Sequence, residues 1–152
     1  MLFKYIILMK KRVDIIGSQP EAYKAVSALE GYVKASSLST VHKELIKIRA
    51  SQINGCAYCI NMHTRDARKA GETEQRIYML NAWRETDLYT EEEKAILALT
   101  EEVTNIKNHV SDETFEKAAS LFDEKYLTDI LMAIVTINSW NRLAITSQKD
   151  LD

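Results

Sequence analysis

Apolar side chains recur every three or four positions along most of the chain, and no segment alternates apolar and polar residues as a half-buried strand does. The first helical segment follows Ser18-Gln-Pro20 and runs to about Lys34, with the proline in its first turn. Further helices are expected at Thr40 to about Ile53, Cys56 to Gly71, Glu74 to Trp83, Thr90 to about Ile106, about Asp112 to Phe122, and about Lys125 to Ala144. The pattern predicts an all-α bundle of six to seven helices in a single domain over residues 1–152.

Local sequence signals place several of these helix ends. Ser39 is suited to cap the helix that begins at Thr40, and Thr90-Glu-Glu-Glu93 has the form of a capping box. Asn54-Gly55 is a typical helix break, so the next helix is expected to begin at Cys56.

The last helix contains a run, Ile130-Leu-Met-Ala-Ile-Val-Thr-Ile137, that is apolar on nearly every side. Such a helix must be covered all round, either by its own domain or by a neighbouring subunit. We favour the second source and expect a homo-oligomer.

Composition narrows the functional classes. The 152 residues include 20 basic and 22 acidic ones, for a net charge of −2, and no block of like charge stands out, so neither nucleic acid nor an anionic membrane is an expected partner. The apolar start Met1–Leu8 is short and precedes Lys10-Lys11-Arg12, which is the reverse of a signal peptide; if Met9 is the true start, residues 1–8 are a mis-assigned extension. A cytoplasmic location is expected, and in that reducing compartment two cysteines favour catalysis or metal binding over a structural disulfide.

The only two cysteines lie together in Cys56-Ala-Tyr-Cys59-Ile-Asn-Met-His63. Thiols separated by two residues can close a disulfide, and His63 follows Cys59 by about one helical turn. Backbone N–H groups at a helix start lower the pKa of a thiol there from its usual ~8.5. The pattern indicates redox or peroxide chemistry, in which Cys59 attacks and Cys56 then closes a disulfide.

Glu44 is a further candidate. At helical spacing, one stripe that we expect to face the core comprises Val41, Leu45, Ile48 and Gln52. Glu44 lies on the edge of this stripe, whereas Lys43 and Lys47 are expected to point away from the core. Burial of a carboxylate is costly unless it is paired or protonated. The alternatives are a functional buried carboxylate and a partly exposed one that pairs with Lys47 or Lys43.

Zinc is the rival chemistry, with the two sulfurs, His63 and Glu44 as four ligands. Structural zinc sites usually bring a second ligand pair from elsewhere in the chain, and His42 and His109 stand alone as surface or packing residues. No metal or cofactor is therefore expected.

The full constellation, Glu44-x11-Cys56-x2-Cys59-x3-His63, resembles the alkylhydroperoxidase D-like branch of the carboxymuconolactone decarboxylase family. The segments Ile48–Cys59, Ala82–Glu85, Thr90–Thr104 and Ile137–Arg142 also look like this branch, so that the resemblance covers about residues 20–146.

The resemblance implies an all-helical fold that assembles as trimers or hexamers and acts as a thiol peroxidase without a cofactor. Cys59 would attack a hydroperoxide and become a sulfenic acid, Cys56 would condense with it, and Glu44 and His63 would relay protons. An external dithiol, from a lipoyl-bearing or thioredoxin-like protein, would reduce the disulfide.

One position departs from the best-known peroxidases, because Tyr58 stands where they carry a histidine, and tyrosine with a pKa near ~10 is a poorer proton relay. Lactone decarboxylation is not expected, since the decarboxylases lack the paired cysteines. Two alternatives remain: a dithiol oxidoreductase or redox sensor acting on protein disulfides, and a non-enzymatic oligomeric binding protein.

Overall fold

A computed structural model describes residues 12–151, so the proposed mis-assignment of residues 1–8 falls outside the described residues. Within that range the chain is helical and contains no strand, which confirms the all-α class. Among residues 12–151, six helices have eight or more residues: α2 (Pro20–Ala35), α3 (Thr40–Asn54), α4 (Ala57–Lys69), α6 (Glu91–Thr104), α7 (Asp112–Ala119) and α8 (Glu124–Ser147). The shorter elements are α1 (Ile15–Ser18), α5 (Glu74–Tyr78) and the 3₁₀ turns η1 (Leu80–Glu85) and η2 (Ile106–Asn108).

The helix starts follow the capping signals. The Ser39 hydroxyl accepts the N–H of His42 at 3.1 Å, and Thr90 and Glu93 form the reciprocal bonds of a capping box. The expected helix from Glu74 to Trp83 is instead split: α5 ends at Tyr78, and the 3₁₀ turn η1 that follows is itself kinked at Ala82 (φ −118°, ψ 24°). Three helices end two to three residues before the expected position: Lys69, Thr104 and Ala119 are their last residues.

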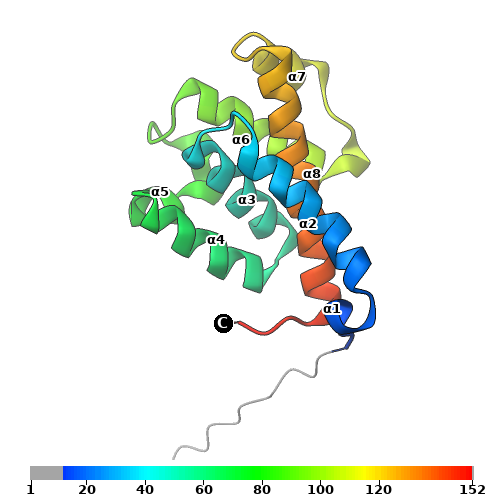
Figure 1. Ribbon diagram of the computed structural model, residues 1–152. Coiled ribbons are helices and arrows are strands. Elements are labelled where there is room, and N and C mark those ends of the chain that lie inside the picture. The colour runs from blue at the N-terminus through cyan, green and yellow to red at the C-terminus, as the bar shows by residue number, and fades with distance from the viewer. Residues whose placement is uncertain (1–11, 152) are drawn as a thin grey trace, which may run out of the picture.

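Helix α3 lies inside the bundle, where α4, α6 and α8 pack around it (Figure 1). One side of it carries Ile46 and Ala50 into a core shared with α2, α6 and α8. Another side carries Leu45 and Ile48 into a second core shared with α4, η1 and α6. Because α3 contacts two cores, its buried residues cover more of the helix surface than a single stripe.

This position corrects two expectations for α3. Val41, expected to face the core, is 38% exposed, because it lies in the first turn of the helix at the edge of the bundle. Lys47, expected to point away, is only 5% exposed and binds Glu30 of α2, with 2.6 Å between Nζ and Oε1.

The long helix α8 runs along α2 and α3 (Figure 1) and buries Ile130, Ile134 and Ile137. On its outer side, Leu131 and Val135 remain 45% and 40% exposed, so the domain itself covers only part of the apolar run. Among residues 12–151, no helix combines the length and apolarity that a membrane crossing requires.

Asp129 of α8 anchors the loop before α3. Its carboxylate accepts bonds from the Tyr32 hydroxyl (2.7 Å), the Ser37 hydroxyl (2.7 Å) and the Ser37 N–H (3.1 Å). Burial raises the pKa of Asp129, but the hydrogen bonds from Ser37 and Tyr32 outweigh it and hold that pKa below its usual value. The ionised carboxylate thus ties the end of α2 and the α2–α3 loop to α8.

Candidate dithiol site

The two cysteines lie at the start of α4. Cys56 is the N-cap residue, its Sγ accepts the N–H of Cys59 at 3.4 Å, and the two Cα atoms are 5.4 Å apart. The sulfur atoms are at disulfide-bonding distance, as the spacing predicts. Cys56 is 1% and Cys59 2% exposed, so the pair is enclosed by protein.

The turn that carries the cysteines is fixed by the backbone of α3. Gly55 adopts the left-handed conformation (φ 70°, ψ 33°) that glycine tolerates best, and it ends α3. The next N–H, that of Cys56, donates to the carbonyl of Ser51 at 3.0 Å. The Asn54-Gly55 signal therefore sets the angle between α3 and α4.

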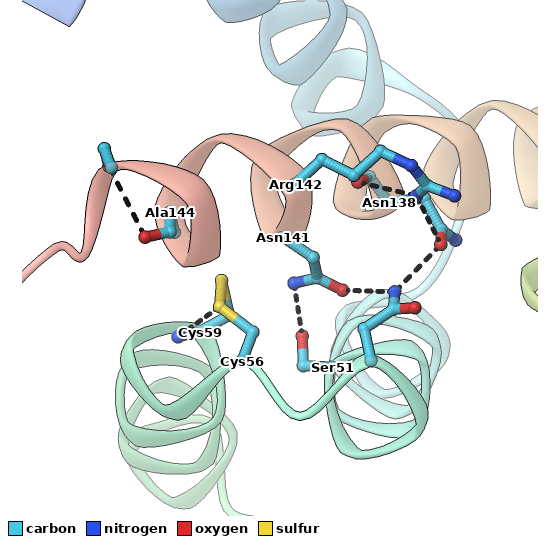
Figure 2. The surroundings of a disulfide bond; sticks show 9 residues. Ser51, Cys56, Cys59, Asn138, Asn141, Arg142 and Ala144 are labelled. Atoms are coloured by element: carbon cyan, nitrogen blue, oxygen red, sulfur yellow. Dashed lines mark hydrogen bonds between the residues drawn. A yellow bond between two sulfur atoms is a disulfide. The ribbon is translucent and has the colours of Figure 1, made fainter. Parts of the chain in front are cut away.

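A buried network then joins the end of α3 to α8 (Figure 2). The Asn54 amide donates to the side-chain oxygens of Asn138 and Asn141, both at 2.9 Å, and the Asn141 amide donates to the Ser51 hydroxyl at 3.0 Å. The Asn138 amide in turn donates to Thr104 of α6 at 3.1 Å. Figure 2 shows the disulfide facing α8 beside this network.

This network was not identified from the sequence. The segment Ile137–Arg142 carries both α8 asparagines and was part of the resemblance, which gave it no role. The informative signal is two asparagines three residues apart on the buried face of an apolar helix, because such groups need polar partners.

Glu44 and His63 are in direct contact. The Glu44 Oε2 lies 3.0 Å from the His63 Nδ1, and the two side chains are 14% and 7% exposed. Glu44 does not pair with either lysine considered as an alternative partner. Lys47 binds Glu30, and Lys43 donates to the carbonyl of Lys34. The contact fixes the ring of His63 one helical turn beyond Cys59.

A cavity of about 720 Å³ adjoins this pair. Glu44, Cys59 and His63 all contribute to its wall, whereas Cys56 lies behind Cys59 and is not among the described residues that line it. The remaining wall combines charged side chains with an apolar and aromatic part that includes Tyr23, Tyr58, Met62, Trp140 and Leu143. The four predicted residues are thus brought to one place, with Cys59 on the open side.

The other two histidines lie elsewhere. The His42 Nδ1 is 2.7 Å from the Tyr126 hydroxyl, and the ring packs edge-on against Phe122, while His109 is exposed. Burial lowers the pKa of His42. Within residues 12–151 there is no group of three or more His, Cys, Asp or Glu side chains arranged to hold a metal ion.

The comparison with protein families identifies the fold. The carboxymuconolactone decarboxylase family matches residues 20–102, more than half of the chain and all four candidate residues. The chain belongs to the carboxymuconolactone decarboxylase family. The resemblance drawn from the motif is therefore confirmed.

Individual relatives of this family agree. The uncharacterized protein YdfG of Bacillus subtilis is 50% identical over 138 residues, which cover 90% of this chain and 94% of that protein. A crystal structure from Agrobacterium tumefaciens, of a protein of unknown function assigned provisionally to antioxidant defence as AhpD, matches with a TM-score of 0.91 and 41% identity over 94% of this chain and 99% of that one. An AhpD-core, peroxidase-related protein from Ralstonia eutropha has the same fold, with a TM-score of 0.78 and 20% identity over 90% and 74% of the two chains.

Family membership covers the dithiol but not all that positions it. The matched residues end at Glu102, so the asparagines of α8 and the cavity wall formed by Trp140 and Leu143 lie beyond them. This AhpD-like protein therefore completes its site with a helix outside the matched segment.

Proposed function

We propose that the protein is a thiol-dependent peroxidase that reduces organic hydroperoxides through a Cys56–Cys59 dithiol–disulfide cycle. The observation that carries the proposal is the position of Cys59, which shares a cavity with the Glu44–His63 pair and has Cys56 at disulfide distance behind it. A nucleophile beside an acid–base group that is itself oriented by a third residue is the usual arrangement of an activated thiol.

The reaction balances with these groups. The Cys59 thiolate attacks one peroxide oxygen, the O–O bond breaks, and the departing alkoxide takes a proton and leaves as an alcohol. Because Glu44 engages the Nδ1 of His63, Nε2 is the ring nitrogen that exchanges the proton. The Cys56 sulfur then attacks the sulfenic acid of Cys59, and a disulfide and water form.

The N-cap position suits Cys56 to this second step. The N–H of Cys59 points at its sulfur, and such a bond favours a thiolate over a thiol. Cys56 is thus the better placed of the two sulfurs to wait as a resolving nucleophile, while Cys59 faces the substrate.

Cavity size and lining support an organic substrate. A volume of about 720 Å³ is in the range of small-molecule sites, and Met62, Trp140 and Leu143 offer an apolar wall to a hydrocarbon group. Hydrogen peroxide would fill little of this space and would make none of these apolar contacts.

Two electrons must come from an external dithiol. The disulfide is almost fully buried, and access to it leads through the cavity to Cys59, which favours a slender donor such as a lipoyl arm over a flat protein surface. A thioredoxin-like protein is the other donor class. A trimeric or hexameric assembly is part of the proposal, with the exposed Leu131 and Val135 of α8 as its support.

Rapid mixing of the reduced protein with cumene hydroperoxide tests the proposal. Thiol oxidation should be orders of magnitude faster than that of free cysteine, and mass spectrometry should find a sulfenic acid on Cys59 in the Cys56→Ser variant. Cys59→Ser should abolish oxidation. Thiol loss no faster than that of free cysteine would contradict the proposal, and an unmodified Cys59 in Cys56→Ser would show that the assigned roles are reversed or wrong.

A second candidate, a dithiol oxidoreductase that acts on protein disulfides, is favoured by one observation. Tyr58, which stands between the two cysteines in the sequence, lines the cavity. A histidine at this position would supply a further proton, and tyrosine is a poorer proton relay. This candidate predicts slow peroxide oxidation together with a reduction potential within reach of cellular dithiols, measured against glutathione. A couple that no cellular dithiol reduces would exclude it.

A further inference from the structure

The tyrosine between the cysteines is covered by a lysine from the C-terminal end of the described chain. The Lys149 Nζ lies 4.1 Å from the centre of the Tyr58 ring, in cation–π geometry. Both residues line the same cavity as Cys59. Figure 1 shows the segment after α8 running past the start of α4. A positive charge is therefore held at the cavity wall on the residue adjacent to Cys59.

The backbone before and at Lys149 is fixed by hydrogen bonds. Gln148 adopts the left-handed conformation (φ 52°, ψ 57°), its N–H donates to Ile145 at 3.2 Å, and the N–H of Lys149 donates to Ala144 at 3.0 Å. These are the two bonds of a Schellman motif, which turns the chain sharply at the end of a helix. The end of α8 thus directs Lys149 back toward α4.

Other cations of the cavity are engaged differently. The Lys47 charge is offset by Glu30 at 2.6 Å, and the Lys43 ammonium donates to backbone carbonyls of residues 34 and 36. Lys34 is exposed to solvent. The π face of Tyr58 holds the Lys149 ammonium without cancelling its charge, as a carboxylate would.

Carboxylates also line the cavity. Glu44 is engaged by His63, and Asp14, Asp66 and Asp150 are exposed, where water and salt screen their charge. The part of α8 that lines the cavity, residues 140–147, contributes uncharged side chains. Lys149 and His63 are therefore the positive or protonatable groups best placed to act on Cys59.

We propose that Lys149 is a positioning residue for the dithiol: held on Tyr58, its ammonium group stabilises the thiolate of Cys59 over the thiol. The inference rests on the proposed function in taking Cys59 as the reacting cysteine. It also gives Tyr58 a role different from that of a proton relay, because the ring acts as the seat of the charge. Arginine is able to replace lysine here, since its guanidinium also stacks on aromatic faces.

The test is the pH dependence of iodoacetamide alkylation of Cys59 in the reduced, full-length Cys56→Ser protein, where serine keeps a capping oxygen at the start of α4. Lys149→Gln should move the midpoint of the alkylation profile to higher pH and slow alkylation below that midpoint by about three- to tenfold. Lys149→Arg should keep the parent profile. Tyr58→Leu should slow alkylation as Lys149→Gln does, whereas Tyr58→Phe, which keeps the ring, should not.

Two controls make the result specific. Lys107→Gln removes an exposed lysine of η2 with the same change in net charge and should leave the profile unchanged. Because the ring and the ammonium act as one unit, Tyr58→Leu combined with Lys149→Gln should slow alkylation no further than either change alone.

A Lys149→Gln profile that coincides with the parent, an arginine variant that behaves like glutamine, or additive effects in the double variant would each overturn the inference. Alkylation does not involve peroxide, so the two proposals fail separately. If the variants alkylate as expected but the protein does not reduce hydroperoxides, only the proposed peroxidase function fails. If the protein reduces hydroperoxides but the Lys149→Gln profile is unchanged, only the proposed role of Lys149 fails.

Discussion

The buried link between α3 and α8 yields a quantitative prediction for Asn141→Leu. Asn141 is fully buried and makes two side-chain hydrogen bonds, to Asn54 at 2.9 Å and to Ser51 at 3.0 Å. Leucine has a similar volume, so the main loss is polar. We expect the reduced protein to lose stability because both bonds disappear and one partner stays buried.

The magnitude follows from the partners left behind. Two hydrogen bonds contribute about 1 kcal/mol each, and the Ser51 hydroxyl, also fully buried, is left without its donor at a cost of about 1–2 kcal/mol. Asn54 keeps its bond to Asn138 and adds little. The free energy of unfolding should therefore fall by about 3–4 kcal/mol, a large part of the 5–15 kcal/mol typical of a domain.

Urea unfolding followed by circular dichroism, at one fixed protein concentration, measures this loss. Asn81→Leu is the matched control, since Asn81 is exposed and the same substitution there should change stability by less than about 0.5 kcal/mol. Adding Ser51→Ala to Asn141→Leu removes the orphaned hydroxyl and should recover about 1 kcal/mol. A loss below about 1 kcal/mol for Asn141→Leu, or no recovery in the double variant, would refute the assigned role of the network.

Three further outcomes are expected. Glu44→Gln should slow peroxide reduction by about 100-fold in rapid mixing while leaving the urea midpoint close to that of the parent, because it weakens the orientation of His63; a rate within threefold of the parent would argue against the relay. The pKa of Asp129 is lowered in the folded protein, so its stabilisation is complete above the unfolded pKa of about 3.9 and is lost as pH falls through the folded pKa; Asp129→Asn should flatten the acid limb of a plot of urea midpoint against pH. Leu131→Glu should lower the mass measured by light scattering if the outer face of α8 packs against another subunit, and an unchanged mass would move the interface elsewhere.

Features encoded by neighbouring residues were predictable from the sequence. The caps at Ser39 and Thr90 and the break at Asn54-Gly55 act over three or four positions, and the structure has each of them. The dithiol at a helix start and His63 one turn later follow from the same local geometry. The contact of Glu44 with His63 needed the relation between two helices, which the break between them largely sets.

Features that depend on distant segments were not predictable in the same way. The sequence of α3 predicts one buried stripe. In the structure two cores contact the helix on different sides, and Lys47 is buried as well. Asn138 and Asn141 find their α3 partners more than eighty positions away, and Lys149, beyond the end of α8, meets Tyr58 in the first turn of α4. A local sequence pattern does not determine how distant helices pack, and it is this packing that brings those pairs together.

The hydrogen bond from the Cys59 N–H to the Cys56 sulfur has a consequence for the energetics of the redox couple. The atom that caps α4 is also the atom that is oxidised and reduced, so winding of the first helical turn and reduction of the disulfide are two legs of one thermodynamic cycle. Any change that favours the wound turn more in one oxidation state than in the other must shift the reduction potential by the same free energy. Substitutions at Gly55 or Ala57, which alter neither cysteine, are therefore able to change the reduction potential of the Cys56–Cys59 pair.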